Sequence, residues 1–459
     1  MKNMRLLVFL GAMTALVLGL GVSGCAGPKR FSPVSPVQQP AGRTLVDGLQ
    51  LVGVGLAEQK TSLTVSATGA CLVLDGRSGQ RLARLDGGEV ELTCRRSGDR
   101  VVWQSGQRKG IADVVVLQPL DPGYRVGYGD HRYRGEFLIL PTPASLGLTL
   151  VNNVELENYL RGVVPWEIGR HGRDRMAALE AQAVAARTYT ISHLKSRSSR
   201  GFDVFASVMD QVYRGSADED AFCNEAIDQT AGLILRYGGK EIEAYYSACC
   251  GGVTSRIEEV WAREGMPYLV SHVDAMDSGE PFCSDYRYYH WREEWTAGRL
   301  EEILQTTLPE YLAYMSEPAR IEWAGSLFIP RDAGGQGAVP GGLLDLEILD
   351  RTTSGRVSHL AVRTEAGEYR VRGDRVRWVL RPESGNPAIL RSARFEVELI
   401  HRDGRLAEVA TRGRGYGHGI GLCQAGSLVM AERGYTFREI LAHYYPGVSP
   451  TVGTITKRK

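Results

Sequence analysis

The sequence lacks an excess of charge of either sign. Its 459 residues include 54 Lys and Arg against 53 Asp and Glu, which gives a net charge of +1 at pH 7. A general nucleic-acid-binding protein needs a basic face, so we expect no nucleic-acid partner. The sequence is not poor in hydrophobic residues: 43% of its residues are hydrophobic and 23% are charged. This composition excludes disorder of the whole chain.

Long hydrophobic runs are missing after the N-terminus. The one long apolar stretch, residues 6–22, follows Lys2 and Arg5 and leads into a Val-Ser-Gly-Cys segment that ends at Cys25. A basic start, a short apolar stretch and small residues are typical of a secretory signal peptide. Because the small residues end in Cys, as in a bacterial lipobox, we expect residues 1–24 to be a lipoprotein signal peptide and Cys25 to be lipidated. An ordinary signal peptide or an uncleaved anchor helix is the alternative.

The residues after Cys25 refine the expected location. Position 26 is Ala rather than Asp, which favours the outer membrane in an envelope with two membranes. We therefore expect a lipoprotein that is attached to a membrane by its lipid and faces the periplasm. Residues 25–45 contain several Pro and little apolar pattern, which predicts a tether between the lipid and the folded part.

Cysteine pairs with the spacing of a zinc ribbon are absent. The sequence has no Cys-x-x-Cys pair and no His-rich cluster. An exported protein can form disulfides, and seven cysteines remain once Cys25 is lipidated. Because seven is odd, at least one thiol stays free or pairs outside the chain. Cys71 and Cys94 are one candidate pair. The cysteines are at positions 25, 71, 94, 223, 249, 250, 283 and 423.

The pattern of apolar residues predicts a mixed α+β fold. Residues 46–151 contain short β-favouring runs separated by Gly, Asp and Pro, which predicts a β-rich N-terminal part. Helical spacing then begins, and the Ala-rich stretch 177–186 predicts a tightly packed, buried helix. A second helix is predicted over residues 217–230. The two-Gly turn at 238–239 predicts a β-hairpin over residues 233–245.

The C-terminal half continues the mixed pattern. Residues 296–316 are predicted to be helical and belong to an insertion at 296–340, after which short strands return from residue 341. A capping box at Thr436–Glu439 predicts a last helix that reaches Tyr445 and ends at Pro446-Gly447. No repeat of fixed period is present.

Glu167 is the strongest candidate for a catalytic residue. It follows Pro165 and Trp166 and precedes Ile168. Apolar neighbours that remove water from a carboxyl group raise its pKa, and such a group is the usual general acid in glycosidic bond cleavage. The alternative is a carboxylate at a helix end that makes a cap or a salt bridge, which is the commoner role of such acids.

Two further segments contain candidate ligands for a substrate. Residues 209–215 combine amide, carboxyl and phenol groups that suit sugar hydroxyls, although an ordinary polar loop has the same composition. Residues 413–426 contain six Gly, which predicts unusual backbone angles and close approach. The spacing of a nucleotide-binding loop is absent there. His418 in this segment is either a buried His or a group that orients an acid or binds sugar. A protease that uses Cys423 and His418 is a further alternative, but these two residues have no third group in the segment to orient them, which disfavours it.

Together these segments resemble the SpoIID/LytB family of bacterial cell-wall proteins, over roughly residues 50 to 450. The family's Leu-Glu-x-Tyr-Leu-x-Gly-Val-Val-x-x-Glu stretch corresponds to residues 156–167, and its Ala-Gln-Ala-x-Ala-Ala-Arg-Thr-Tyr stretch to 181–189. Its Gln-Val-Tyr-x-Gly loop is at 211–215, and its Gly-x-Gly-His-Gly-x-Gly-x-x-Gln stretch is at 415–424. Residues 440–447 are similar to the family's ending. The resemblance places a catalytic core at 152–295 and a C-terminal part at 341–450.

The resemblance implies a lytic transglycosylase. Such an enzyme cuts the MurNAc–GlcNAc bond of peptidoglycan and leaves a 1,6-anhydro-MurNAc end, with a preference for strands that an amidase has stripped of peptides. Glu167 matches the catalytic Glu, and Arg187 is expected to bind the lactyl carboxylate, with a surface ion pair as its alternative. The alternative function is a non-catalytic activator or recruiter of an N-acetylmuramoyl-L-alanine amidase, or a glycan-binding scaffold. The expected substrate-binding residues are Gln182, Arg187, Tyr189, Gln211, Tyr213, His418 and Gln424.

The chain departs from its relatives at several positions. Many relatives have Lys where this chain has Glu180, and their spacing from Glu to Arg is about two residues shorter than the spacing from Glu167 to Arg187. Some relatives bind zinc through a His-Ser-Thr-x-Gly-Gly region, and Ser247 replaces that His here. The resemblance therefore implies no metal and no cofactor. It also implies a Cys250–Cys283 disulfide, with Cys249 as the competing partner.

Overall fold

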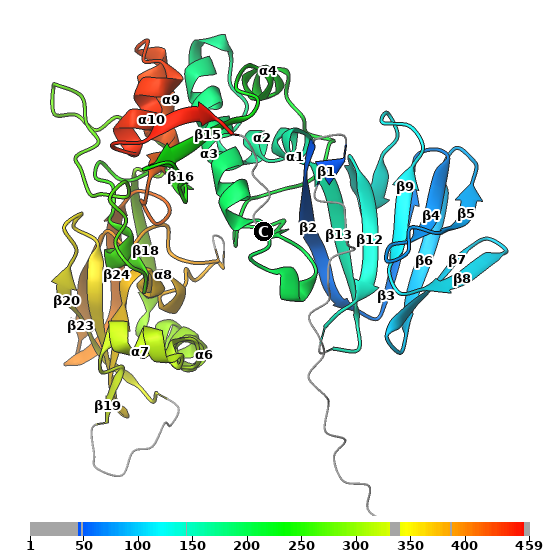
Figure 1. The fold of residues 1–459 in the computed structure, drawn as a ribbon. Coiled ribbons are helices and arrows are strands. Elements are labelled where there is room, and N and C mark those ends of the chain that lie inside the picture. Colours follow the sequence, from blue (N-terminus) through cyan, green and yellow to red (C-terminus); the bar gives the residue numbers. More distant parts are fainter. Residues whose placement is uncertain (1–44, 47–48, 144, 331–339, 386–387, 454–459) are drawn as a thin grey trace, which may run out of the picture. The chain divides into compact units, whose positions relative to one another are not determined.

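The computed structural model describes residues 45–46, 49–143, 145–330, 340–385 and 388–453. The expected signal peptide, the expected lipidation site Cys25 and nearly all of the tether lie outside these residues. Within the described ranges no helix combines the length and the hydropathy needed to cross a membrane. The described chain contains several sheets and ten α-helices, so the predicted α+β class is confirmed (Figure 1).

The N-terminal part consists of two sheets that enclose one core, and their strands pair antiparallel except for the parallel pair of β14 with β2. Apolar side chains from both sheets meet there, including Val54, Leu63, Leu92, Leu117 and Ile139. Side chains that alternate between buried and exposed along Ser62–Ala67 show why these short runs form strands with one inner face. The first sheet has the order β1 (Leu45–Val46), β2 (Leu49–Lys60), β13 (Leu148–Glu155), β12 (Glu136–Pro141), β9 (Val115–Pro119), β4 (Cys71–Asp75) and β5 (Arg81–Leu85), and β14 (Val204–Phe205) pairs with β2. The second has the order β11 (His131–Tyr133), β10 (Val126–Tyr128), β3 (Ser62–Ala67), β6 (Val90–Ser97), β7 (Arg100–Ser105) and β8 (Arg108–Ala112).

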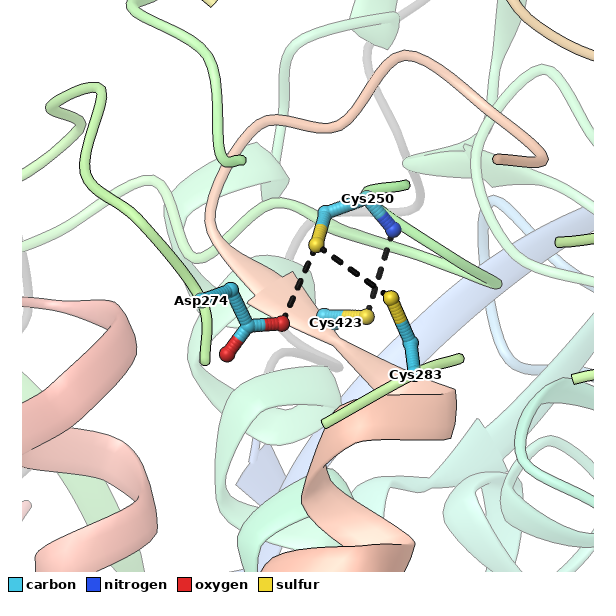
Figure 2. Close-up of side chains that lie close together, drawn as sticks. All are labelled: Cys250, Asp274, Cys283 and Cys423. Atoms are coloured by element: carbon cyan, nitrogen blue, oxygen red, sulfur yellow. Dashed lines mark hydrogen bonds between the residues drawn. The ribbon is translucent and has the colours of Figure 1, made fainter. Parts of the chain in front are cut away.

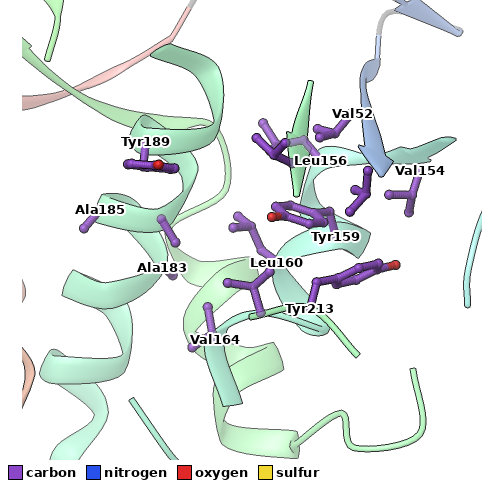
Figure 3. Close-up of a cluster of buried hydrophobic side chains, with 14 of the residues drawn as sticks. Val52, Val154, Leu156, Tyr159, Leu160, Val164, Ala183, Ala185, Tyr189 and Tyr213 are labelled. Carbon is purple, nitrogen blue, oxygen red and sulfur yellow. The ribbon is translucent and has the colours of Figure 1, made fainter. Parts of the chain in front are cut away.

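The helices that follow β13 pack onto the same core. Helix α1 (Leu156–Arg161) begins where β13 ends, because the Glu155 carboxylate accepts the backbone N–H groups of Glu157 and Asn158. Figure 3 shows apolar side chains of α1, α2 (Val164–Glu167) and α3 (Met176–His193) around Tyr159 and Leu160. Every residue of α3 from Ala181 to Thr190 is buried, so the predicted Ala-rich buried helix is confirmed.

Two predicted elements differ in extent from the observed ones. Helix α4 (Ala221–Gln229) begins four residues later than expected, because the Asp220 carboxylate caps its N-terminus. The hairpin of β15 (Leu233–Tyr237) and β16 (Lys240–Glu241) has the predicted two-Gly turn, with positive φ at both glycines. Its second strand ends at Glu241. On its other edge β15 pairs with β26 (Ser449–Val452).

A second core lies between residues 291 and 409. Its members include Trp295, Leu304, Leu360 and Val409, so the long helix α6 (Ala297–Met315) and the strands after residue 341 share one apolar interior. The predicted helix at 296–316 is confirmed. The elements are β18 (His290–Thr296), α6, α7 (Pro318–Ala324), β19 (Phe328–Pro330), β20 (Leu343–Arg351), β21 (Val357–Thr364), β22 (Gly367–Arg372), α8 (Val376–Val379), β23 (Phe395–Arg402) and β24 (Arg405–Arg414).

The last elements return to the first core. Helix α10 (Phe437–Tyr444) opens with the predicted capping box at Thr436 and Glu439. Strand β25 (Leu422–Cys423) pairs in parallel with β17 (Tyr246–Ser247) and leads directly into α9 (Gln424–Glu432), which packs against α3. The short helix α5 (Ile257–Val260) lies between these segments in sequence. This return places the Gly-rich stretch beside the helices that contain Glu167 and Gln182.

Candidate active site

Glu167 lies at the C-terminal end of the short helix α2. Its Oε1 accepts the backbone N–H of Val212 at 2.7 Å, and its carboxyl group is also hydrogen-bonded by the side chain of Gln424. Val212 belongs to the loop at 209–215, and Gln424 is the first residue of α9. The structure therefore brings three of the sequence segments together around one carboxyl group.

The environment of Glu167 favours its neutral form. Removal of water by the surrounding protein raises the pKa of Glu167 to about 7, and the hydrogen bonds from Val212 and Gln424 lower it only in part. No Lys, Arg or His of the described chain forms an ion pair with this carboxyl group, so the alternative of a salt-bridged acid is not supported. Glu167 as a whole residue is half-buried.

Two amide side chains form a chain of contacts that begins at the carboxyl group. Gln424 donates from Nε2 to Oε1 of Gln182 at 3.3 Å. Gln182 is fully buried on α3, and its own Nε2 has no acceptor among the described residues. Both residues were expected to bind substrate; the structure places Gln424 at the Glu167 carboxyl group and Gln182 at Gln424.

Gln211 is used within the protein rather than offered to a ligand. Its Oε1 accepts hydrogen bonds from Tyr159 at 3.0 Å and Thr190 at 2.8 Å, and its Nε2 donates to the Tyr246 hydroxyl at 2.9 Å and to the Ala186 carbonyl at 3.2 Å. Every polar valence of the amide is occupied in a fully buried position. Gln211 therefore fixes the loop that presents the Val212 N–H to Glu167.

The two predicted tyrosines are also held by the protein. Tyr189 donates to Asp210 at 3.0 Å, and Arg197 pairs with the same carboxylate oxygen at 2.9 Å. Tyr213 donates to Asn152 at 2.8 Å and is 3% exposed. Both phenol groups thus support the loop at 209–215 rather than face an open site.

Arg187 is a correction to the sequence interpretation. Its side chain is completely buried and binds Glu157 through two hydrogen bonds, Nε to Oε1 at 2.8 Å and Nη2 to Oε2 at 2.6 Å. It also donates to the carbonyl oxygens of Ile227 and Leu233. The guanidinium group has no donor directed at a ligand, so its partner is Glu157 and neither a substrate carboxylate nor a surface acid.

His418 is neutral and structural. Burial lowers its pKa to about 4, Nδ1 accepts the N–H of Ile420 at 3.0 Å, and the ring also bonds to the backbone of Tyr246. Its ring lies 5.0 Å from that of Trp261. His418 therefore ties the Gly-rich stretch to β17. The close approach requires Gly417, because a Cβ there would lie 2.7 Å from Cβ of Ser247.

The expected Cys250–Cys283 disulfide is absent from the structure. The two Sγ atoms are 3.7 Å apart, which is too far for a bond, and the seven described cysteines are free thiols. Cys249, the competing partner, has its Sγ 3.9 Å from the Cys283 carbonyl oxygen. Cys71 and Cys94, the other candidate pair, are also unpaired with each other.

Three features of the site escaped the sequence interpretation. The Val212 N–H is a backbone group with no signature of its own. Tyr246 lies close to Glu167, and burial together with that carboxyl group raises the pKa of its phenol well above its ordinary value. Arg214 is exposed and stacks on Trp166, the neighbour of Glu167, with its guanidinium carbon 4.1 Å from the ring centroid. The Arg between Tyr213 and Gly215 was visible in the sequence as the variable position of the loop motif.

Comparison with known proteins supports the family that the motifs indicated. Residues 144–237 match the SpoIID family, described as stage II sporulation protein, and residues 334–421 match a domain of unknown function (DUF8618). An uncharacterised protein of Brachyspira hyodysenteriae is 28% identical over 317 residues, which cover 69% of this chain and 71% of that one. The stage II sporulation protein D of Bacillus amyloliquefaciens is 28% identical over 349 residues, 72% of this chain and 85% of its own.

A further relative is named for a different role. The amidase enhancer of Bacillus subtilis is 28% identical over 303 residues, which cover 64% of this chain but only 40% of that protein. The match to the SpoIID family spans the segments that supply Glu167, Gln182 and the loop at 209–215. Residues 144–237 of this chain are therefore similar to the SpoIID family, and relatives with that family's names align over about two thirds or more of the chain.

Proposed function

We propose that the chain is a cell-wall enzyme, a lytic transglycosylase that cleaves the MurNAc–GlcNAc bonds of peptidoglycan and forms 1,6-anhydro-MurNAc ends. The observation that carries the proposal is the carboxyl group of Glu167, whose pKa is raised to about 7 in a partly exposed site. A group with this pKa is protonated often enough near neutral pH to donate a proton, and it can accept one in a later step.

The proposed reaction uses Glu167 twice. The protonated carboxyl group donates its proton to the glycosidic oxygen as the bond from C1 of MurNAc to that oxygen breaks. The resulting carboxylate then accepts the proton of the MurNAc 6-hydroxyl while O6 bonds to C1. No water is consumed, and Glu167 ends in its starting form. The N–H groups of Val212 and Gln424 stabilise the carboxylate formed between the two steps.

The surroundings of Glu167 suit this reaction better than hydrolysis. Hydrolases usually need a second carboxylate, either as a nucleophile or as a base that activates water. Asp210, the carboxylate of the adjacent loop, is 1% exposed and is occupied by Arg197, Tyr189 and the Phe205 N–H. A mechanism in which the substrate supplies its own hydroxyl needs only the one free carboxyl group.

The proposal includes a preference for peptide-stripped strands. In it Arg214, and not Arg187, binds the lactyl carboxylate of MurNAc. Removal of the stem peptide exposes a lactyl carboxylate on MurNAc. Arg214 is exposed, and it stacks on Trp166, the sequence neighbour of Glu167, which holds the guanidinium plane in place. A cell-wall amidase would supply such strands. The expected lipid on Cys25, with location at the outer membrane facing the periplasm, would keep the enzyme close to the wall.

The test is a product analysis with the full-length chain in detergent. The wild type and the Glu167→Gln variant are incubated with intact peptidoglycan and with amidase-stripped glycan, and 1,6-anhydro ends are quantified by mass spectrometry. We expect anhydro ends from stripped glycan only, and none from the variant. Gln keeps an acceptor for the Val212 N–H, so the variant should stay folded and still bind glycan.

One observation favours a second candidate function, the activation of an amidase. The amidase enhancer of Bacillus subtilis is 28% identical to this chain over 303 residues. An activator would increase the rate of a purified amidase without producing anhydro ends, and Glu167→Gln would leave that increase unchanged. The same two proteins, assayed with and without an amidase, therefore separate the two functions.

A further inference from the structure

We propose that a buried cluster of Cys250, Asp274, Cys283 and Cys423 binds one zinc ion. Each residue offers one ligand atom, and all four atoms lie within 4.8 Å of one another (Figure 2). All four side chains are buried and come from three separate segments of the chain. This cluster is distinct from the Glu167 site, and the inference does not rest on the proposed function.

The spacing of the sulfur atoms fits a tetrahedral ion. With Zn–S bonds of about 2.3 Å, two thiolates on a tetrahedral zinc lie about 3.8 Å apart. The Sγ atoms of Cys250 and Cys283 are 3.7 Å apart, whereas a disulfide needs about 2.0 Å. The carboxylate oxygen Oδ2 of Asp274 is 3.0 Å from Sγ of Cys250 and supplies the fourth ligand.

Backbone N–H groups point at the sulfur atoms as they do around bound thiolates. Sγ of Cys423 accepts the N–H groups of Cys250 at 3.2 Å and Gly426 at 3.4 Å, and Cys423 is the N-cap of α9. Sγ of Cys250 accepts the Gly252 N–H at 3.3 Å. Donors and a helix N-terminus both stabilise negative charge on sulfur, which is the form that binds metal.

The carboxylate ligand is oriented by a second layer of residues. Asp274 is completely buried, and its Oδ1 is bonded by Nε2 of His443 at 3.0 Å and by the Tyr444 hydroxyl at 3.1 Å. Such outer contacts fix the orientation of a metal-binding carboxylate. The Tyr444 hydroxyl also lies 3.3 Å from Oδ2, the oxygen that faces Cys250. Both partners lie on α10, so the final helix of the fold supports the cluster.

Zinc would balance much of the negative charge that the cluster carries once its thiols have lost their protons. Three thiolates and one carboxylate carry four negative charges, and zinc removes two of them. Buried Arg356 contributes a positive charge nearby, since it donates to the carbonyl oxygens of Cys250 at 2.7 Å and Val253 at 3.1 Å. On binding, each protonated thiol releases its proton to solvent.

The ligand set also selects the metal. Thiolates favour zinc over magnesium or calcium, and a mixed set of three sulfurs and one oxygen suits a tetrahedral zinc ion with no open position. The sequence interpretation expected no metal because Ser247 replaces a His of some relatives. Ser247 is not among these four ligands, so that replacement does not bear on the cluster.

Zinc would join the cluster to the Glu167 site. Cys423 directly precedes Gln424, whose side chain reaches the Glu167 carboxyl group. An ion held by Cys423 therefore fixes the start of α9 and with it the position of Gln424. We expect zinc to act as a structural ion that positions this residue.

The test is the metal content of the full-length chain, purified in detergent with reductant and without chelator. Elemental mass spectrometry should find one zinc per chain in the wild type, and loss of zinc in Cys250→Ser and Asp274→Asn. Cys223→Ser is the matched control, because Cys223 is equally buried on α4 but lies outside the cluster; it should keep its zinc. Tyr444→Phe, which removes an outer contact, should weaken zinc binding roughly 10-fold.

A second measurement decides the matter if a ligand variant fails to fold. The wild type, exchanged into cobalt, should show the absorption bands of tetrahedral cobalt bound to thiolates. A wild type that contains no zinc after dialysis against zinc would overturn the proposal. So would linked Cys250 and Cys283 peptides in the native chain, which would establish the disulfide instead, or full zinc content in folded Cys250→Ser.

Discussion

Glu157 and Glu167 lie ten residues apart in one motif, and their carboxyl groups have different partners. Glu157 faces the buried guanidinium of Arg187, with hydrogen bonds of 2.6 and 2.8 Å. Glu167 faces only neutral donors, the Val212 N–H and the Gln424 amide. A buried carboxyl group beside a cation is stable as an anion, whereas one beside neutral groups is pushed toward its protonated form. Glu167 is therefore suited to the role of a general acid, because burial raises its pKa and its neutral partners do not cancel the rise, whereas the Glu157 carboxyl group is held by Arg187.

The largest expected effect is on catalysis and concerns Glu167, the carboxyl group with neutral partners. Glu167→Gln should reduce the rate of anhydro-end formation by about 10²–10⁴-fold, because it removes the proton that the leaving oxygen needs. Glu157→Gln is the matched control and should leave kcat within a few-fold while lowering stability. The comparison would fail if both variants lost activity to the same extent without unfolding.

Breaking the pair of Glu157 and Arg187 should lower the stability of the protein. Arg187→Met should lower the free energy of unfolding by about 3 kcal/mol, since it leaves Glu157 without its cation and removes donors from two carbonyl oxygens. Urea unfolding followed by circular dichroism measures the change. Unaltered binding of stripped glycan by the folded variant would agree with a structural Arg187, whereas a selective loss of binding with unchanged stability would return it to the substrate site.

The raised pKa of Glu167 predicts a pH dependence of stability with a definite sign. The folded chain holds the proton more tightly than the unfolded chain, because the pKa rises from 4.5 to about 7 on folding. This contribution is therefore full below about pH 4.5 and is lost as pH rises through about 7, for a total of roughly 3 kcal/mol. Urea unfolding of wild type and Glu167→Gln at several pH values measures it. A difference between the two proteins that does not change with pH would contradict the assignment.

A smaller effect is expected on substrate binding and concerns Arg214. Arg214→Ala should raise KM for peptide-stripped glycan about 10-fold, the loss expected for one hydrogen-bonded contact to a charged group, and leave kcat almost unchanged. Glycan in which the lactyl carboxylate is esterified should bind the wild type and the variant equally. A variant that distinguishes the two substrates as well as the wild type would exclude Arg214 from this role.

The smallest expected effect concerns the neutral donors themselves. The hydrogen bond from Gln424 lowers the pKa of Glu167, so Gln424→Ala should raise that pKa by less than about 1 unit. The alkaline limb of the pH profile of kcat/KM should move upward by the same amount. Gln182→Ala, which removes the acceptor for Gln424 and not a donor to Glu167, should move this limb less.

Much of the fold could be predicted because the signals are local. The Ala-rich spacing gives α3, the two glycines at 238–239 give the hairpin turn, and Thr436 with Glu439 gives the start of α10. The boundaries of two predicted elements differ from the observed ones. Helix α4 begins at a cap formed by Asp220, and the second strand of the hairpin ends early because residues after Glu241 leave the sheet.

The candidate site could be predicted only in part, because side-chain roles depend on distant partners. Glu167 with its apolar neighbours was visible in the sequence, as were Gln182 and Gln424 in their motifs. Gln211, Tyr213 and His418 lie in motifs as well, yet their polar atoms are satisfied by Tyr159, Asn152 and backbone groups far away in sequence. A motif identifies such a residue but does not show whether it contacts a ligand or supports one that does.

The sequence by itself determined the elements, the α+β class, the likeness to the SpoIID family and the candidate acid, since each follows from residues close together in the chain. Tertiary structure decided the rest. It pairs Arg187 with Glu157 and surrounds Glu167 with neutral donors. It also brings the ligand atoms of four residues within 4.8 Å of one another: Cys250, Asp274, Cys283 and Cys423. The physical reason is that charge, protonation and metal affinity depend on what lies within a few ångströms of an atom, and folding brings those neighbours from segments far apart in sequence.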